Sequence, residues 1–226
     1  MAKKSSLIAL LLLVPAPSIG ILAGMVIAPD HVWGKLVFFI SKFWILLIPL
    51  FWLTIMDRQK LSWSRPRHGG FGVAAGLGIL ISVILFALYF TAGKFLIEPQ
   101  MLKDMAARTR LANPAIYLAG AAYWILINSV LEEYVWRWFV VRQCNVLMPP
   151  RTAIAVSAIC FTLHHIIAMQ VYLGWLLVII ASLGIFIGGA LWSWCYVRYK
   201  SIWPGYVSHA IVDIAVFAIG YHLIFQ

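Results

Sequence analysis

Long apolar runs separated by short polar segments constrain this chain more than any other feature. Hydrophobic residues make up 64% of the 226 residues and charged residues only 11%, whereas soluble domains carry roughly 45–50% and 25%. Seven runs approach the ~20 residues that a helix needs to cross a bilayer; they are residues 6–28, 35–56, 71–90, 114–141, 152–169, 171–197 and 202–225. We therefore predict an all-α, polytopic transmembrane helix bundle with about seven spans. An eighth short segment, near Gln170 or within the first span, is the alternative.

We predict that residues 1–226 form a single integral-membrane domain, because no stretch has the composition of a separate soluble unit. Residues 1–113 would hold three spans. Within them, residues 98–110 mix Met and Leu with Lys and Arg, a pattern typical of a short amphipathic helix on the membrane surface. A solvated loop would also explain that pattern. Residues 114–226 would form a core of four spans.

The net charge of +10 comes from Lys and Arg residues at the ends of the apolar runs, not from a soluble basic face. We therefore expect no nucleic-acid partner. The short connections on the side of the N-terminus hold roughly twice as many basic residues as those on the other side, which by the positive-inside rule predicts a cytoplasmic N-terminus.

The fourth run contains two adjacent carboxylates, Glu132 and Glu133, at a depth where an ionisable group costs roughly 2.5–3.5 kcal/mol on insertion scales. On an α-helix Glu133 and Arg137 lie four residues apart on one face, so we expect an ion pair. Glu132 is turned by roughly 100° from its neighbour. We expect it to face a cavity as a general base. An Arg–Glu cluster that only braces two helices is the alternative.

Two other runs carry imidazoles at middling depth. His164 and His165 are adjacent in the fifth run, and the spacing does not decide which of them faces the carboxylates. In the last run His209 and Asp213 are four residues apart and share a face. A self-satisfied His–Asp pair would explain that run alone. Polar groups on three separate spans predict one polar chamber in the bundle.

Together these pieces resemble the CAAX-protease and bacteriocin-processing family of intramembrane proteases (CPBP, also called Abi), which includes the type II CAAX prenyl endopeptidases. The family pattern EExxxR, FxxxH and HxxxN or HxxxD is matched by Glu132-Glu133-x-x-x-Arg137, Phe161-x-x-x-His165 and His209-x-x-x-Asp213. The resemblance covers the C-terminal half of the chain.

The resemblance implies an intramembrane endopeptidase and places His165 at the catalytic position. Glu132, assisted by His165, would take a proton from the attacking water. His209 would stabilise the oxyanion, and Asp213 would fix the tautomer of His209 or orient water. Glu133 and Arg137 would hold these groups in place, and His164 would be a polar wall of the chamber or a supporting donor.

Three alternatives stay open. In a metal-dependent protease, zinc would be bound by Glu132, His165, His209 and Asp213; we favour a reaction without a metal because the chain has no HExxH motif. A transporter or proton relay would use the same polar residues as an ion path, but the two halves show no inverted repeat. A pseudoenzyme or assembly partner would keep the fold and lack the activity.

The expected partners are the lipid bilayer and a membrane-associated protein or peptide substrate. The resemblance allows a prenylated tail, a leader peptide or a C-terminal sorting tail. A compact chain without a soluble domain suits a processing enzyme of the bacterial cytoplasmic membrane.

Overall fold

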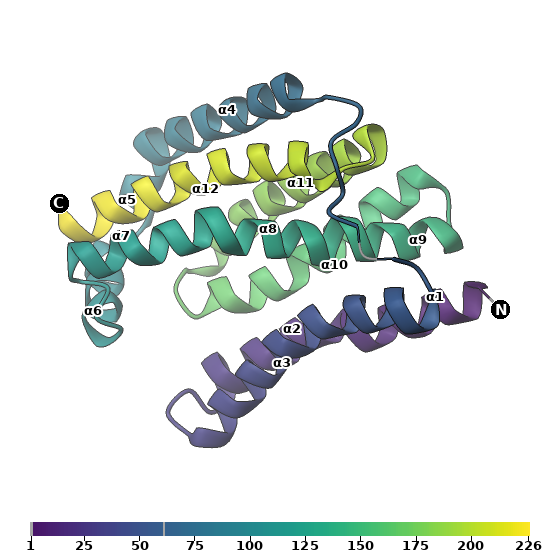
Figure 1. The fold of residues 1–226 in the computed structure, drawn as a ribbon. Helices are drawn as coiled ribbons and strands as arrows, with labels where there is room; N and C mark the ends of the chain where they lie inside the picture. The colour runs from purple at the N-terminus through teal and green to yellow at the C-terminus, as the bar shows by residue number, and fades with distance from the viewer. Residues whose placement is uncertain (1, 61) are drawn as a thin grey trace.

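Seven helical segments long and apolar enough to cross a membrane run through the computed structural model, which describes residues 2–60 and 62–226 (Figure 1). The segments are Lys3–Ile27, Val32–Met56, Phe71–Leu96, Pro114–Leu147, Pro150–Gln170, Trp175–Tyr199 and Ile202–Phe225. Each overlaps one predicted span, and the last has the predicted bounds. The described residues contain no strand. The prediction of an all-α polytopic bundle is therefore confirmed.

Most spans are built from more than one helical piece. The first three spans consist of α1 (Ala2–Leu13), α2 (Pro15–Ile21) and η1 (Leu22–Ile27), then α3 (Val32–Phe51) and η2 (Trp52–Met56), then α4 (Phe71–Leu88), η3 (Tyr89–Gly93) and α5 (Lys94–Leu96). The short helix α6 (Pro99–Arg108) follows, within the stretch predicted to be amphipathic, and it packs against the last span.

The last four spans carry the polar residues. The fourth consists of α7 (Pro114–Tyr123), η4 (Trp124–Asn128), α8 (Ser129–Glu132), η5 (Glu133–Val141) and α9 (Arg142–Leu147). The fifth, sixth and seventh are α10 (Pro150–Gln170), α11 (Trp175–Tyr199) and α12 (Ile202–Phe225). Helices suit this chain because hydrocarbon offers no water to satisfy the backbone, and a helix satisfies its own N–H and C=O groups.

The fourth span departs from ordinary α-helix where it carries its charges. Residues Glu133–Val141 form the π-helix η5, in which hydrogen bonds join residues five apart. Every residue of η5 except Tyr134 is buried, so this stretch lies at the centre of the bundle. Such π-helical segments frequently occur at functional sites.

Small residues on α4 bring it close to α12, the helix that carries His209. A Cβ added at Gly78 would lie 2.9 Å from the carbonyl oxygen of Ser208. One turn later, the Ser82 hydroxyl donates to the carbonyl oxygen of Ile211 across the interface at 3.2 Å. This is the close approach that small residues permit between membrane helices. α12 also packs against α8 and η5, so it is held between α4 and the fourth span.

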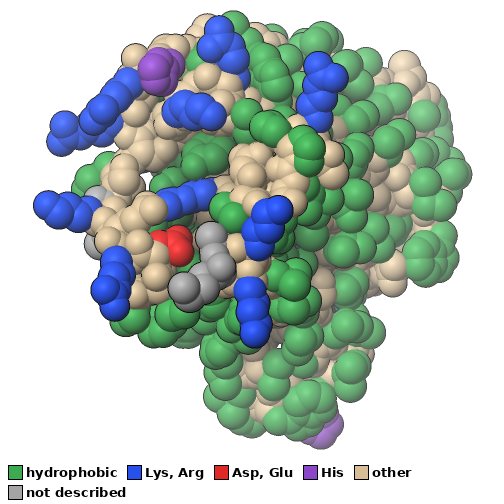
Figure 2. Space-filling model, turned by 90° about the vertical axis from the view of Figure 1, so that its right-hand side faces the viewer, with side chains coloured by type: hydrophobic (Ala, Val, Ile, Leu, Met, Phe, Trp, Pro, Cys, Tyr) green, Lys and Arg blue, Asp and Glu red, His purple; other side chains and the backbone are tan. Residues whose placement is uncertain are grey.

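Lys and Arg side chains gather on the end of the bundle that holds the N-terminus, whereas hydrophobic side chains cover most of its flank (Figure 2). The loop segments of residues 57–60 and 62–70 lie at this end (Figure 1). The prediction of a cytoplasmic N-terminus rests on this uneven distribution of basic residues between the two ends of the bundle. Exposed apolar side chains such as Leu80 and Ile179 on the flank suit contact with lipid.

Candidate active site

Three spans bring the predicted site residues together. Glu132 ends α8 and Glu133 begins η5, while α10 carries His164 and His165 and α12 carries His209 and Asp213. η5 packs against both α10 and α12. The three polar pieces, which are far apart in the sequence, are therefore close together inside the bundle.

Glu133 and Arg137 form the expected ion pair. Arg137 Nε lies 3.4 Å from Glu133 Oε1, and both side chains are fully buried. The guanidinium also lies over two aromatic rings, 4.4 Å from the centroid of Phe161 and 5.1 Å from that of Trp192. Cation–π contacts strengthen when they are desolvated. They help to hold a charge whose nitrogen atoms find no hydrogen-bond acceptor among the described residues.

A glycine on α12 makes room for this ion pair. A Cβ added at Gly205 would lie 2.6 Å from Glu133 Oε2, a distance that would force the carboxylate to move. Only glycine therefore lets α12 pass so close to Glu133. Sequence reasoning did not identify Gly205, although it lies one turn before His209 on the same helix.

His209 lies among three carboxylates. Its Nδ1 donates to Glu133 Oε1 at 3.1 Å, and its Nε2 lies 3.6 Å from Glu132 Oε2 and 3.9 Å from Asp213 Oδ2. The indole of Trp192 stacks on the imidazole, with ring centroids 3.8 Å apart. His209 thus donates its hydrogen bond to Glu133, which α12 approaches closely at Gly205, while Asp213, expected to fix the tautomer of His209 or to orient water, lies on the other side of the ring at Nε2.

Asp213 has a different partner. The Ser129 hydroxyl donates to Asp213 Oδ2 at 2.7 Å, a distance typical of a hydrogen bond to an ionised acceptor. Ser129 is fully buried at the start of α8, three residues before Glu132. The carboxylate of Asp213 is therefore fixed to the helix that carries Glu132. A serine in an apolar run gives little signal in a sequence, which explains why Ser129 was missed.

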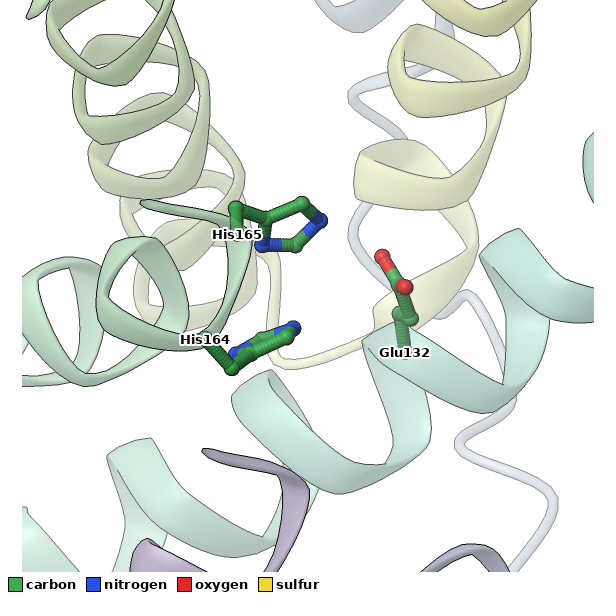
Figure 3. Close-up of side chains that lie close together, drawn as sticks. All are labelled: Glu132, His164 and His165. Atoms are coloured by element: carbon green, nitrogen blue, oxygen red, sulfur yellow. The ribbon is translucent and has the colours of Figure 1, made fainter. Parts of the chain in front are cut away.

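Glu132 faces both imidazoles of α10 (Figure 3). Ligand atoms of Glu132, His164 and His165 all lie within 4.8 Å of one another. Glu132 Oε1 also accepts a hydrogen bond from Asn128 Nδ2 at 2.9 Å, so an amide one turn earlier steadies the carboxylate. Glu132 and Glu133 share His209, but Glu133 also pairs with Arg137, whereas Glu132 faces the histidines of α10.

The two histidines of α10 have different surroundings. His165 Nδ1 donates to the carbonyl oxygen of Phe161 at 2.8 Å, which leaves Nε2 as the free ring nitrogen of the neutral form. His164 is buried and stacks on Trp136, with centroids 5.1 Å apart and planes nearly parallel. Its Nδ1 has no hydrogen-bond partner among the described residues. His164 thus lies beside Glu132, a position that suits either expected role, a polar wall of the chamber or a supporting donor.

The group of residues able to hold a metal shares Glu132 and His165 with the predicted set and adds His164. Within residues 2–60 and 62–226, Glu132, His164 and His165 are the one group of this kind that is close enough together. Two imidazoles and a carboxylate are a donor set found in catalytic zinc sites. His209 and Asp213, which the sequence placed in that set, are instead engaged with Glu133 and Ser129.

A lysine in the second span was also missed. Lys42 lies within α3, which packs against η5. Between Lys35 and Asp57 it is the only charged residue in the sequence. An isolated intramembrane lysine was the signal that could have identified it.

Comparisons with known proteins agree with the resemblance found in the sequence. Residues 113–215 match the family model described as type II CAAX prenyl endopeptidase Rce1-like. The match begins at the fourth span and contains every polar residue of the three motifs. No curated protein and no solved structure matches the chain.

Proposed function

We propose that this integral membrane protein is an intramembrane endopeptidase that uses Glu132 as its general base. Residues 113–215 match the Rce1-like family of type II CAAX prenyl endopeptidases, and endopeptidases are proteases. The observation that carries the proposal is the difference between the two glutamates. Both lie beside His209, but Glu133 is neutralised by Arg137, whereas Glu132 faces His164 and His165.

In the proposed reaction, Glu132 removes a proton from a water molecule and the resulting hydroxide attacks the carbonyl carbon of the scissile peptide bond. The free Nε2 of His165 accepts a hydrogen bond from that water and orients it. A positioned general base of this kind contributes roughly 10²–10⁴-fold to the rate. The proton is then delivered to the leaving nitrogen, the C–N bond breaks, and a new carboxylate and a new amine leave.

His209 is proposed to stabilise the tetrahedral oxyanion. Since Glu133 accepts the Nδ1–H, and Glu132 and Asp213 both face Nε2, the imidazole can carry a hydrogen on each ring nitrogen. Its Nε2–H would then donate to the oxyanion. Loss of one such donor typically lowers kcat by roughly 10²–10³-fold. Asp213, held by Ser129, would support the charge of His209.

A metal-dependent form of the same protease is the second candidate. The observation that favours it is the close approach of Glu132, His164 and His165. Zinc bound there would polarise the scissile carbonyl and lower the pKa of a bound water. His209 and Asp213 would keep the roles proposed above, because neither belongs to this group. We still prefer the mechanism without a metal, because His165 and His209 already lie close enough to Glu132 to assist it in the reaction with water.

The proposed substrate is a membrane-associated protein or peptide cut near a membrane-inserted tail, with the prenylated tail as the first case to test because of the family's name. The experiment uses the full chain, reconstituted in liposomes and incubated with three synthetic peptides: a prenylated C-terminal tail, a leader peptide and a C-terminal sorting tail. Mass spectrometry identifies the products. Cleavage of one class by the wild type, and of none by an E132Q/H165A double variant, is expected. Equal cleavage by both proteins would contradict the proposal.

A further inference from the structure

Lys42 is a cation at the middle of a membrane span. It lies ten residues after the start of the span at Val32 and fourteen before its end at Met56, which corresponds to about 15 Å and about 21 Å along the helix. A lysine stem is much shorter than either distance, so the ammonium cannot reach the headgroups by snorkelling. Lipid phosphate is thereby excluded as its partner.

The ammonium of Lys42 also has no anionic partner within the protein. Among the described residues no carboxylate oxygen lies within ion-pair distance of it. Its one specific neighbour is the ring of Phe38, one turn earlier, whose centroid is 5.2 Å from Nζ. Charged groups at this depth are normally paired with one another or face a polar cavity, and they mark substrate pathways.

Lys42 is on the side of α3 that faces the candidate active site. Leu46, one turn later on the same face, packs against the buried core, and its carbonyl oxygen lies 3.4 Å from the hydroxyl of Tyr134 in η5. α3 also packs against η5, which begins at Glu133, the residue next to the proposed base. The second span therefore places an ammonium close to the proposed base, although not in contact with it.

We propose that Lys42 binds the free C-terminal carboxylate of the substrate and thereby positions the tail of the substrate in the site. A segment that enters hydrocarbon brings few charged side chains, because each is costly there. The last residue of every chain, however, carries a carboxylate. An ammonium near the scissile bond would offset the desolvation of that carboxylate and position a short tail across Glu132.

This inference rests on the proposed function, so its test measures binding separately from cleavage. The E132Q variant, which should bind without cutting, is titrated with fluorescent prenylated tail peptides that end in either a free carboxylate or a carboxamide. The free acid is expected to bind at least about tenfold more tightly, as loss of a hydrogen bond between charged groups would give. In E132Q/K42M the two peptides should bind equally, and E132Q/K42R should retain part of the difference.

The control is E132Q/K35M, which removes the lysine near the start of the same span and should leave the acid-to-amide ratio unchanged. Equal binding of both peptides to E132Q, or a K42M effect that weakens both equally, would overturn the proposal. The outcomes also separate the two claims. If the ratio depends on Lys42 but the wild type cleaves no peptide, the carboxylate site stands and the proposed function falls. If cleavage occurs but the free acid binds no more tightly than the carboxamide, the proposed function stands and the carboxylate site falls.

Discussion

Nδ1 of His209 lies 3.1 Å from Oε1 of Glu133, although 76 residues separate them in the chain. A histidine of the last span is thus oriented by a glutamate of the fourth, and the same glutamate neutralises Arg137. Glu133 therefore links the two helices that carry the proposed base and the proposed oxyanion donor. In the proposed reaction, the neighbouring Glu132 is the residue that acts on water.

Glu133→Gln is expected to destabilise the protein strongly. The substitution leaves the buried guanidinium of Arg137 without a counter-charge, and breaking a buried pair in this way costs about 3–5 kcal/mol. Thermal unfolding in detergent should show a clear fall in Tm. Glu98→Gln, which changes a carboxylate at the N-terminal edge of α6 outside the spans, is the matched control. An unchanged Tm for Glu133→Gln would show that the pair is not structural.

Gly205→Ala should also destabilise the protein and should reduce cleavage. The new Cβ would lie 2.6 Å from Glu133 Oε2 and displace the carboxylate that orients His209. Gly184→Ala in α11, where an added Cβ meets nothing within 4 Å, should leave stability unchanged or raise it by about 0.5–1 kcal/mol. Unfolding and cleavage are measured for both variants. Equal behaviour would refute the close packing of α12 on Glu133.

Ser129→Ala is expected to slow cleavage by about two- to tenfold in a protein that still folds. Without the Ser129 hydroxyl, Asp213 loses its 2.7 Å hydrogen bond and part of its orientation toward His209, and one such bond contributes about 0.5–1.5 kcal/mol. Ser182→Ala is the control, because that hydroxyl bonds only within its own helix. A wild-type rate for Ser129→Ala would remove Asp213 from the proposed support of His209.

Metal dependence is tested by chelation and by metal content. In the glutamate mechanism, a chelator leaves cleavage unchanged and the purified protein holds no stoichiometric zinc. In the metal-dependent form, a chelator abolishes cleavage, zinc restores it, and His164→Ala lowers the zinc content as much as His165→Ala, because the two imidazoles lie together beside Glu132. Elemental analysis of both variants provides a measurement that does not depend on activity.

Much of this arrangement could be predicted from the sequence because the bilayer restricts what a chain can do. Apolar runs of sufficient length must be helices, so the spans were found close to their observed bounds. The four-residue spacing of Glu133 and Arg137 also predicted their contact. Both predictions depend on local spacing alone.

The contacts between spans could not be predicted in this way. The four-residue spacing of His209 and Asp213 predicted that they share a face, and they lie 3.9 Å apart, but it could not predict that His209 donates a hydrogen bond to Glu133 of another span. That contact depends on the packing of α12 at Gly205 and on the π-helical path of η5. Lys42 was overlooked for a related reason, since its span carries none of the three motifs and its position near Glu132 becomes evident only when α3 is packed against η5.

The central claim is that Glu132, and not its neighbour, activates the water. The most direct measurement compares single-turnover cleavage of one peptide by the wild type, E132Q and E98Q in liposomes, with Tm recorded for each. The account predicts that E132Q retains the wild-type Tm and loses at least about 10²-fold in rate, as expected for a missing general base, while E98Q is unchanged in both. Cleavage by folded E132Q at the wild-type rate would contradict the account.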